Sequence, residues 1–158
     1  MIDEIDAQIL TILQENGRCS NADIARQIGM APSAIYERIR KLEAAEVIRG
    51  YTTQLHAPSL DLGLLAFILV RTSDRLGTGD TGAQLAQIPN VLEVHDIAGE
   101  DCYLVKVRTA GTEALGRLLR DQFGPIPTII STRTTIVLST IKEQTQLPIA
   151  GPGEERNG

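Results

Sequence analysis

The chain has 158 residues, of which 42% are hydrophobic, and a formal net charge of −5 at pH 7. This length fits one ordinary domain or two small ones, and the apolar fraction excludes a wholly disordered chain. The negative charge excludes nucleic-acid binding through the field of the whole protein, so a DNA contact requires a local basic patch. No run of about 18 uncharged apolar residues exists, so we expect no membrane segment and a cytoplasmic location. Two cysteines, Cys19 and Cys102, are too few for a disulfide framework and have no metal-ligand spacing.

The N-terminal third of the chain predicts three helices. Apolar residues at helical spacing indicate a first helix over residues 3–16. A second helix is expected to begin after the N-cap Ser20, with which Asp23 can complete a capping box. It should end at Gly29, which suits a positive φ, and Pro32 then suits the first turn of a third helix. Two short helices joined by a tight turn form a helix-turn-helix, the geometry of many DNA-binding heads.

The third predicted helix, residues 32–44, has its apolar side chains on one face, so the opposite face is free to contact a partner. The candidate DNA-binding residues of this helix are Ser33, Tyr36, Glu37, Arg38, Arg40 and Lys41. Residues 1–50 contain six basic and eight acidic residues, a net charge of −2, whereas residues 36–49 have a net charge of +1. A single head of this charge should bind DNA weakly, and several heads joined in an oligomer far better.

The basic residues of this helix allow two interpretations. Arg40 and Lys41 contact phosphates or bases, or they form an ordinary solvated face, and the helix-turn-helix pattern favours DNA contact. Arg40 or Tyr36 reaching a base edge would carry specificity, and arginine bound to guanine through two hydrogen bonds is the expected form. Glu37 can accept a hydrogen bond from cytosine or pair with Lys41 one turn later, and we favour the pair. Arg38 lies beside the buried face, so we favour a structural or phosphate-clamping role for it.

Residues 47–54 have a β-rich composition and predict a linking strand, followed by a turn at Ala57-Pro58-Ser59. The chain then alternates strands and helices. The expected boundaries are a helix-turn-helix domain at 1–50, a linker strand and hinge at 51–63, a second domain at 64–145 and a flexible tail at 146–158.

The second domain has the order βαββαβ of the ferredoxin-like split unit, which makes the fold class α+β. We expect strands at 64–71, 91–98, 102–108 and 129–142, helices at 80–88 and 112–123, and a Gly-containing loop at 74–79. In this fold the helices cover only one sheet face, and neither face of the last strand is plainly polar. A second apolar face implies that another sheet packs against it, so we expect dimerisation through sheets.

Several segments resemble a known family. They are Ile5-Asp6-x-x-Ile9-Leu10, Leu42-Glu43-x-x-x-Val47-Ile48-x-Gly50-Tyr51-Thr52, Thr132-Arg133-Thr134, and Glu93-Val94-His95 followed by Gly99 and Tyr103-Leu104-Val105-Lys106. In order and spacing, over residues 2–142, they resemble the Lrp/AsnC family, the leucine-responsive or feast/famine transcription regulators. The resemblance implies an N-terminal helix-turn-helix and a C-terminal ligand-binding and oligomerisation domain. It also implies homodimers that assemble further, with an octamer as the expected form.

The resemblance further implies a small-molecule effector, in many members an amino acid bound between dimers. The effector-binding residues that it implies are Gly99, Glu100, Asp101, Cys102, Tyr103, Thr132 and Thr134. The family usually has an acid where this chain has Cys102, so Glu100 or Asp101 would have to supply the carboxylate for an ammonium group. Two departures flank the third helix: Ala31 replaces a usual serine cap, and Glu46 replaces a usual glycine and is expected to be left-handed.

The leading hypothesis is a sequence-specific transcriptional regulator that binds double-stranded DNA and a small-molecule effector, with no catalytic residue, cofactor, metal or membrane partner. One alternative is an enzyme similar to siroheme decarboxylase subunits, which have a similar architecture. That chemistry requires a large pocket with basic and histidine groups, and the second half offers only His95, which we interpret as structural, and scattered arginines. The other alternative is an architectural DNA-binding protein that responds to no effector.

Overall fold

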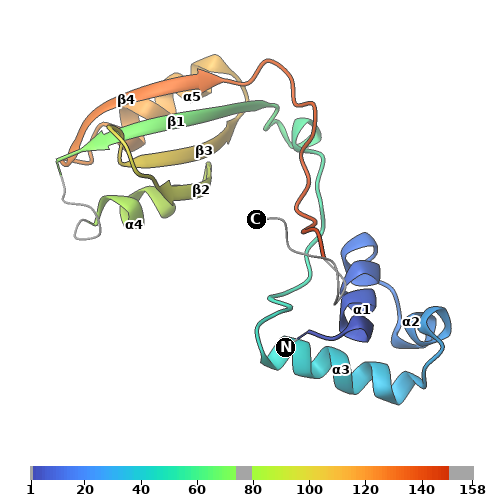
Figure 1. Ribbon diagram of the computed structural model, residues 1–158. Helices are drawn as coiled ribbons and strands as arrows, with labels where there is room; N and C mark the ends of the chain where they lie inside the picture. The colour runs from blue at the N-terminus through green and yellow to red at the C-terminus, as the bar shows by residue number, and fades with distance from the viewer. Residues whose placement is uncertain (1, 74–79, 150–158) are drawn as a thin grey trace. The chain divides into compact units, whose positions relative to one another are not determined.

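The computed structural model describes residues 2–73 and 80–149, and the chain divides into two units (Figure 1). The first unit joins Met1–Gln54 to the segment that begins at Lys142, and the second unit is Leu55–Ile141. The chain therefore passes from the first unit to the second and returns. The loop expected at 74–79 and most of the tail expected at 146–158 lie outside the described residues.

Three helices form the head, as predicted: α1 (Glu4–Glu15), α2 (Asn21–Ile28) and α3 (Pro32–Ala44). Their buried side chains are Ile9, Leu10, Ile24, Ala25, Ile35, Ile39 and Leu42. Each large aliphatic side chain removed from water contributes about 1.5–3 kcal/mol before the entropy of ordering is subtracted. This core fixes the inner face of α3 and leaves its opposite face exposed.

Local signals at α2 are largely confirmed. The Ser20 hydroxyl accepts the backbone N–H of Asp23 at 3.1 Å, and Gly29 ends the helix with a φ of 81°. The capping box expected at Asp23 is corrected, because its carboxylate accepts the Ser20 hydroxyl at 2.6 Å and pairs with Arg26 at 3.0 Å. The carboxylate is thus held by a hydroxyl and a cation.

The structure shows the effect of both departures beside α3. Ala31 occupies the N-cap position of α3 without a side-chain hydrogen bond. Glu46 has a φ of 54°, in the left-handed region. A residue other than glycine pays about 1–2 kcal/mol for that conformation.

The strand expected at 47–54 is wrong. This segment has no strand, and only a 3₁₀ turn at Ala57–Leu60 follows it. A strand requires a neighbour that completes its backbone hydrogen bonds, and each of the described strands pairs only within the second unit. The β-rich composition of this segment therefore does not produce a strand in the single chain.

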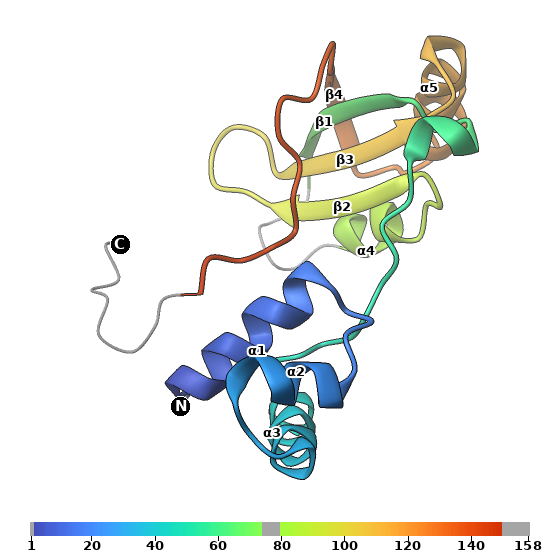
Figure 2. The same cartoon turned by 90° about the vertical axis from the view of Figure 1, so that its right-hand side faces the viewer.

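The second unit has the predicted order of strands and helices. Its elements are β1 (Leu64–Thr72), α4 (Thr81–Ala86), β2 (Val91–Asp96), β3 (Tyr103–Thr109), α5 (Thr112–Leu118), a π-helical turn (Leu119–Phe123) and β4 (Ile129–Ile136). The strands form one antiparallel sheet in the order β2-β3-β1-β4 (Figure 2), which confirms the ferredoxin-like α+β fold.

Two helices of this unit are shorter than expected. Helix α4 ends at Ala86 instead of residue 88, and Asp80 precedes it without capping it through its side chain. Helix α5 ends at Leu118, where a wider turn begins and the Gly124 N–H reaches the Leu119 carbonyl at 2.9 Å. Apolar spacing predicted a continuous helix here. The wider turn changes the backbone hydrogen bonds but not which side chains are apolar, so the spacing does not reveal it.

Strand β4 is also shorter than the expected 129–142. It pairs with β1, and Ala66 lies opposite Ile136. The Val137 N–H still bonds the Leu65 carbonyl at 2.9 Å, and β1 itself begins at Leu64. The ladder therefore stops where β1 offers no further partner.

The two faces of the sheet differ. On one face, the buried residues Ala66, Ile68, Val70, Val105 and Val107 pack with Leu85, Leu115, Leu118 and Phe123 from the helical segments. We call the other face the open face. By strand register it carries Phe67, Leu69, Arg71, Glu93, His95, Leu104, Lys106, Arg108, Ser131, Arg133 and Thr135. Its centre is apolar, and charged side chains surround that centre.

The described part of the expected tail, residues 146–149, lies against α1. The Gln14 amide donates to the Leu147 carbonyl at 3.0 Å and accepts the Leu147 N–H at 2.6 Å. Gln146 donates to the Gln14 backbone carbonyl at 3.0 Å, and Ile149 packs against the apolar core of the head. These contacts place the segment in the same unit as the head.

Candidate functional site

The outer face of α3 presents the side chains that the sequence predicts for DNA binding. Ser33, Tyr36, Glu37, Arg40 and Lys41 are all exposed. Ile35 and Ile39, buried on the inner face, fix the rotation of the helix about its axis. The exposed residues can therefore reach a partner together, as a recognition helix requires.

The ion pair favoured between Glu37 and Lys41 is not formed: within residues 2–73 and 80–149, neither side chain has an ion-pair partner. An exposed pair one turn apart is worth only about 0.3–0.5 kcal/mol, too little to hold two long side chains in one geometry. The described residues also offer Arg40 no ion-pair partner. Both cations of this face, Arg40 and Lys41, are thus available to an anionic partner.

Arg38 is arranged differently. Its Nη1 donates to the carboxylates of Asp3 and Asp6, each at 2.7 Å. The two carboxylates in turn form the capping box of α1, because the Asp6 N–H donates to Asp3 at 2.8 Å and the Asp3 N–H donates to Asp6 at 3.2 Å. Arg38 therefore ties α3 to the start of α1, which supports the structural role inferred for it. This capping box was not predicted, although acids at N-cap and N3 are its signal in the sequence.

Electrostatics agree with this contact. The pKa of Asp3 lies below its ordinary value, first because the Asp6 backbone N–H donates to it and then because Arg38 does. The pKa of Arg38 is raised, chiefly by its hydrogen bonds to Asp3 and then Asp6. The Arg38 guanidinium is thus bonded to two carboxylates within the head.

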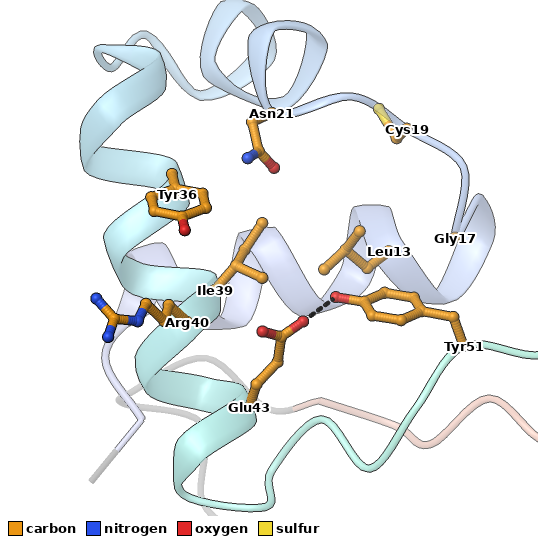
Figure 3. Close-up of a pocket in the computed structure, with 9 residues that line it drawn as sticks. All are labelled: Leu13, Gly17, Cys19, Asn21, Tyr36, Ile39, Arg40, Glu43 and Tyr51. Carbon is orange, nitrogen blue, oxygen red and sulfur yellow. Dashed lines mark hydrogen bonds between the residues drawn. The ribbon is translucent and has the colours of Figure 1, made fainter.

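A shallow pocket of about 240 Å³ adjoins the exposed face of α3 (Figure 3). Its lining residues are Leu13, Gly17, Cys19, Asn21, Tyr36, Ile39, Arg40, Glu43 and Tyr51. Asn21, the first residue of α2, and Tyr36 on α3 both line it. Side chains of this kind commonly bind phosphate oxygens. Asn21 was not among the predicted residues, although its place directly after the Ser20 cap is a signal in the sequence.

At the other end of the pocket, the Tyr51 hydroxyl donates to the Glu43 carboxylate at 3.0 Å. The pKa of Tyr51 is raised by burial of the phenol and then by this carboxylate. Both residues belong to one sequence motif, but the contact was not predicted, because the seven residues between them must fold back before it can form.

The expected effector loop follows β2. Gly99 has a φ of 141°, which favours glycine, and Glu100 is exposed. Asp101 pairs with Arg133 on β4, with Oδ2 and Nη2 2.8 Å apart. Cys102 packs toward the core, and its Sγ lies 3.9 Å from the Thr72 carbonyl.

Tyr103 is buried, and a Cβ added to Gly82 would lie only 3.0 Å from its ring. It therefore packs closely against α4 and is covered within the single chain. The remaining effector candidates, Thr132 and Thr134, lie on β4 opposite Val70 and Ile68 and thus on the helix-covered side of the sheet.

The structure therefore does not bring all the effector candidates together within one chain. The loop meets β4 through Arg133 on the open face, whereas Thr132 and Thr134 project from the opposite side. Asp101 is committed to an arginine, and Glu100 has no ion-pair partner among the described residues. Glu100 is thus the carboxylate of this loop that remains available to an ammonium group.

Among residues 2–73 and 80–149, no helix combines the length and apolar character needed to span a membrane.

A model of the Lrp/AsnC ligand binding domain matches residues 65–147, and a model of the AsnC-type helix-turn-helix domain matches residues 2–43. The chain is 40% identical, over 149 residues, to the HTH-type transcriptional regulator FL11 of Pyrococcus horikoshii. The match covers 94% of this chain and 97% of that protein.

Two solved structures are also similar. One is the transcriptional regulator NMB0573 of Neisseria meningitidis in complex with L-methionine, with a TM-score of 0.88, 31% identity and coverage of 94% of this chain and 97% of that one. The other is the feast or famine regulatory protein Rv3291c of M. tuberculosis complexed with L-methionine, with a TM-score of 0.86, 30% identity and coverage of 95% and 100%. These relatives are regulators, and the siroheme-decarboxylase alternative finds no support among them. The chain belongs to the Lrp/AsnC family of DNA-binding transcriptional regulators.

Proposed function

We propose that this protein is a sequence-specific regulator that binds double-stranded DNA through the outer face of α3 and works in the cytoplasm, beside the chromosome. The observation that carries the proposal is the contrast between Arg38, which two carboxylates hold, and Arg40 and Lys41, which project outward without an ion-pair partner among the described residues. Arg40 and Tyr36 are the candidates for base edges, while Lys41, Ser33 and Asn21 suit the phosphate backbone.

Arg40→Ala in the full chain tests this role. We expect it to weaken binding to DNA from upstream of the protein's own coding sequence by about tenfold or more, since a good arginine–base pair is worth about 1–3 kcal/mol. Fluorescence anisotropy at several salt concentrations measures this change. The matched control is Arg117→Ala, which removes the same charge from an exposed pair with Glu113 in the second unit. Equal affinities for the Arg40 variant and the control would contradict the proposal.

Assembly completes the proposed DNA-binding function. The head has a net charge of −2, so one head holds DNA weakly, and two or more heads on one particle bind with a high effective concentration. The open face, with Phe67, Leu69 and Leu104 at its centre, is the surface we propose for pairing two sheets. Dimers formed in this way would assemble further, with an octamer as the expected form.

The effector is proposed to be an amino acid bound at the loop after β2, between dimers. Support comes from the L-methionine found in two similar structures and from the available carboxylate of Glu100. Calorimetric titration with L-methionine, followed by the other amino acids, tests the proposal. We expect binding by the full chain and weaker binding by Glu100→Gln. An absence of binding for every amino acid would favour the effector-independent architectural protein.

A further inference from the structure

Tyr51 reaches from the start of the linker across the head to the recognition helix. Its ring lies beside Gly17, where an added Cβ would be 3.7 Å from Tyr51 Cδ1, and its hydroxyl donates to the Glu43 carboxylate at 3.0 Å. Tyr51 is 53% exposed, so its ring is only partly covered by the head. Figure 3 shows the Glu43 carboxylate turned toward this hydroxyl.

Glu43 is placed where it could compete for Arg40. The two residues are three positions apart on α3, a spacing at which opposite charges meet on a helix surface. Elsewhere in the chain, Asp23 and Arg26 make such a pair at 3.0 Å. On α3 the pair is absent from the described contacts, and Figure 3 shows the Arg40 guanidinium pointing away from Glu43.

A hydrogen bond from a neutral phenol satisfies the carboxylate without using a cation. The Tyr51 hydroxyl holds Glu43 on the pocket side of α3, so the Arg40 guanidinium is not drawn across the helix surface toward it. We propose that Tyr51 is a positioning residue for DNA binding, which keeps Arg40 free by holding Glu43. This inference rests on the proposed contact between Arg40 and DNA.

A double-mutant cycle in the full chain tests the inference. Tyr51→Phe keeps the ring beside Gly17 and removes only the hydroxyl, so the freed Glu43 carboxylate can capture Arg40. We expect the dissociation constant for the upstream DNA to rise about twofold for one head, and about fourfold where two heads bind together. In a Glu43→Gln background the same change should have no effect, because a neutral amide does not attract the guanidinium.

Glu37→Gln is the matched control background. Glu37 lies three positions from Arg40 on the other side and has no bond to Tyr51, so Tyr51→Phe should weaken binding there as much as in the wild type. Three results would overturn the inference. Tyr51→Phe could leave the DNA affinity of the wild type unchanged, or it could still weaken binding in the Glu43→Gln background. Its effect could also disappear equally in the Glu37→Gln background. If Arg40→Ala weakens binding while Tyr51→Phe does not, the inference alone fails. If Arg40→Ala binds as the wild type does, the proposed role of Arg40 fails with it.

Discussion

Arg38 and Arg40 lie two positions apart on α3, yet their different surroundings give them different roles. Two residues turn a helix by about 200°, so Arg40 projects outward while Arg38 lies near the core edge, where Asp3 and Asp6 meet it at 2.7 Å. Those carboxylates also satisfy two free N–H groups at the start of α1. One side chain therefore joins a helix cap to the recognition helix.

This junction predicts an acid-sensitive head. The folded pKa of Asp3 lies below its ordinary value of 3.8, so its contribution to stability is fully present above that pH and is lost as the pH falls through the lower folded value. Arg38→Gln should lower the unfolding temperature at neutral pH, and the gap from the wild type should shrink below about pH 4 as the Asp3 carboxyl group becomes protonated. Thermal melts followed by far-ultraviolet circular dichroism at pH 7 and pH 3 measure both effects.

Arg26→Gln is the control for this prediction. Its pair with Asp23 is exposed on both sides, with side-chain exposures of 77% and 46%, and should contribute little to stability. Equal destabilisation by the two substitutions, or a gap for Arg38→Gln that does not change with pH, would show that the junction with Asp3 and Asp6 is not the cause.

At the residue scale, sequence reasoning succeeded where the cause was local. The left-handed φ of Glu46 followed from its replacing a glycine of the family pattern, and the φ of Gly29 from its place after a helix. It could not find the partners of Arg38, because Asp3 lies 35 positions away and only the packing of α1 on α3 brings them together. The pair favoured between Glu37 and Lys41 is local, yet it is not made, because an exposed pair one turn apart is worth only about 0.3–0.5 kcal/mol.

The C-terminal segment is the element whose position the sequence did not reveal. Its composition indicated a flexible tail, whereas residues 146–149 are held on α1 by Gln14 and by the apolar contact of Ile149. The head is consequently joined to the second unit at two points of the chain, before Leu55 and after Ile141.

Gln14→Ala should release this segment. It removes both bonds between the Gln14 side chain and Leu147, each worth about 0.5–1.5 kcal/mol, so amide hydrogen exchange at Leu147 should accelerate by about tenfold or more. Mass-spectrometric hydrogen exchange of peptides covering 143–149 measures this. Gln8→Ala, the same substitution on an exposed position of α1, is the control and should leave the exchange unchanged. Similar exchange in both variants would mean that Gln14 does not hold the segment.

The sequence predicted an element well where the residues that fix its ends lie next to it in the chain. Caps and breakers at Ser20, Gly29 and Pro32 located α2 and the start of α3. The boundaries of strands depend on partners: β4 stops where β1 begins, and residues 47–54 have no described strand beside them. Side-chain pattern therefore gave the order of the strands better than their ends.

At the scale of the whole molecule, the pairing proposed for the open face would connect fold to function. Its central residues are apolar, and Leu69 lies between Leu104 on β3 and Arg133 on β4. Burial of such a surface against its own copy removes apolar area from water and forms an isologous contact. Because each chain contributes one head, the same contact would decide how many heads reach DNA together.

Leu69→Asp tests this link, since it puts a charge at the centre of the surface proposed to pair. We expect light scattering to show a shift from dimers or larger particles to monomers, with the helical circular dichroism retained. The affinity for the upstream DNA should then fall by about a hundredfold, because a separate head loses the effective concentration that its partner supplies.

Leu60→Asp, at an exposed leucine in the 3₁₀ turn and outside the sheet, is the control and should leave both the mass and the affinity unchanged. A monomeric Leu69→Asp variant that binds DNA as tightly as the wild type would separate assembly from DNA binding. A variant that keeps its full assembled mass would instead show that the chains pair through another surface.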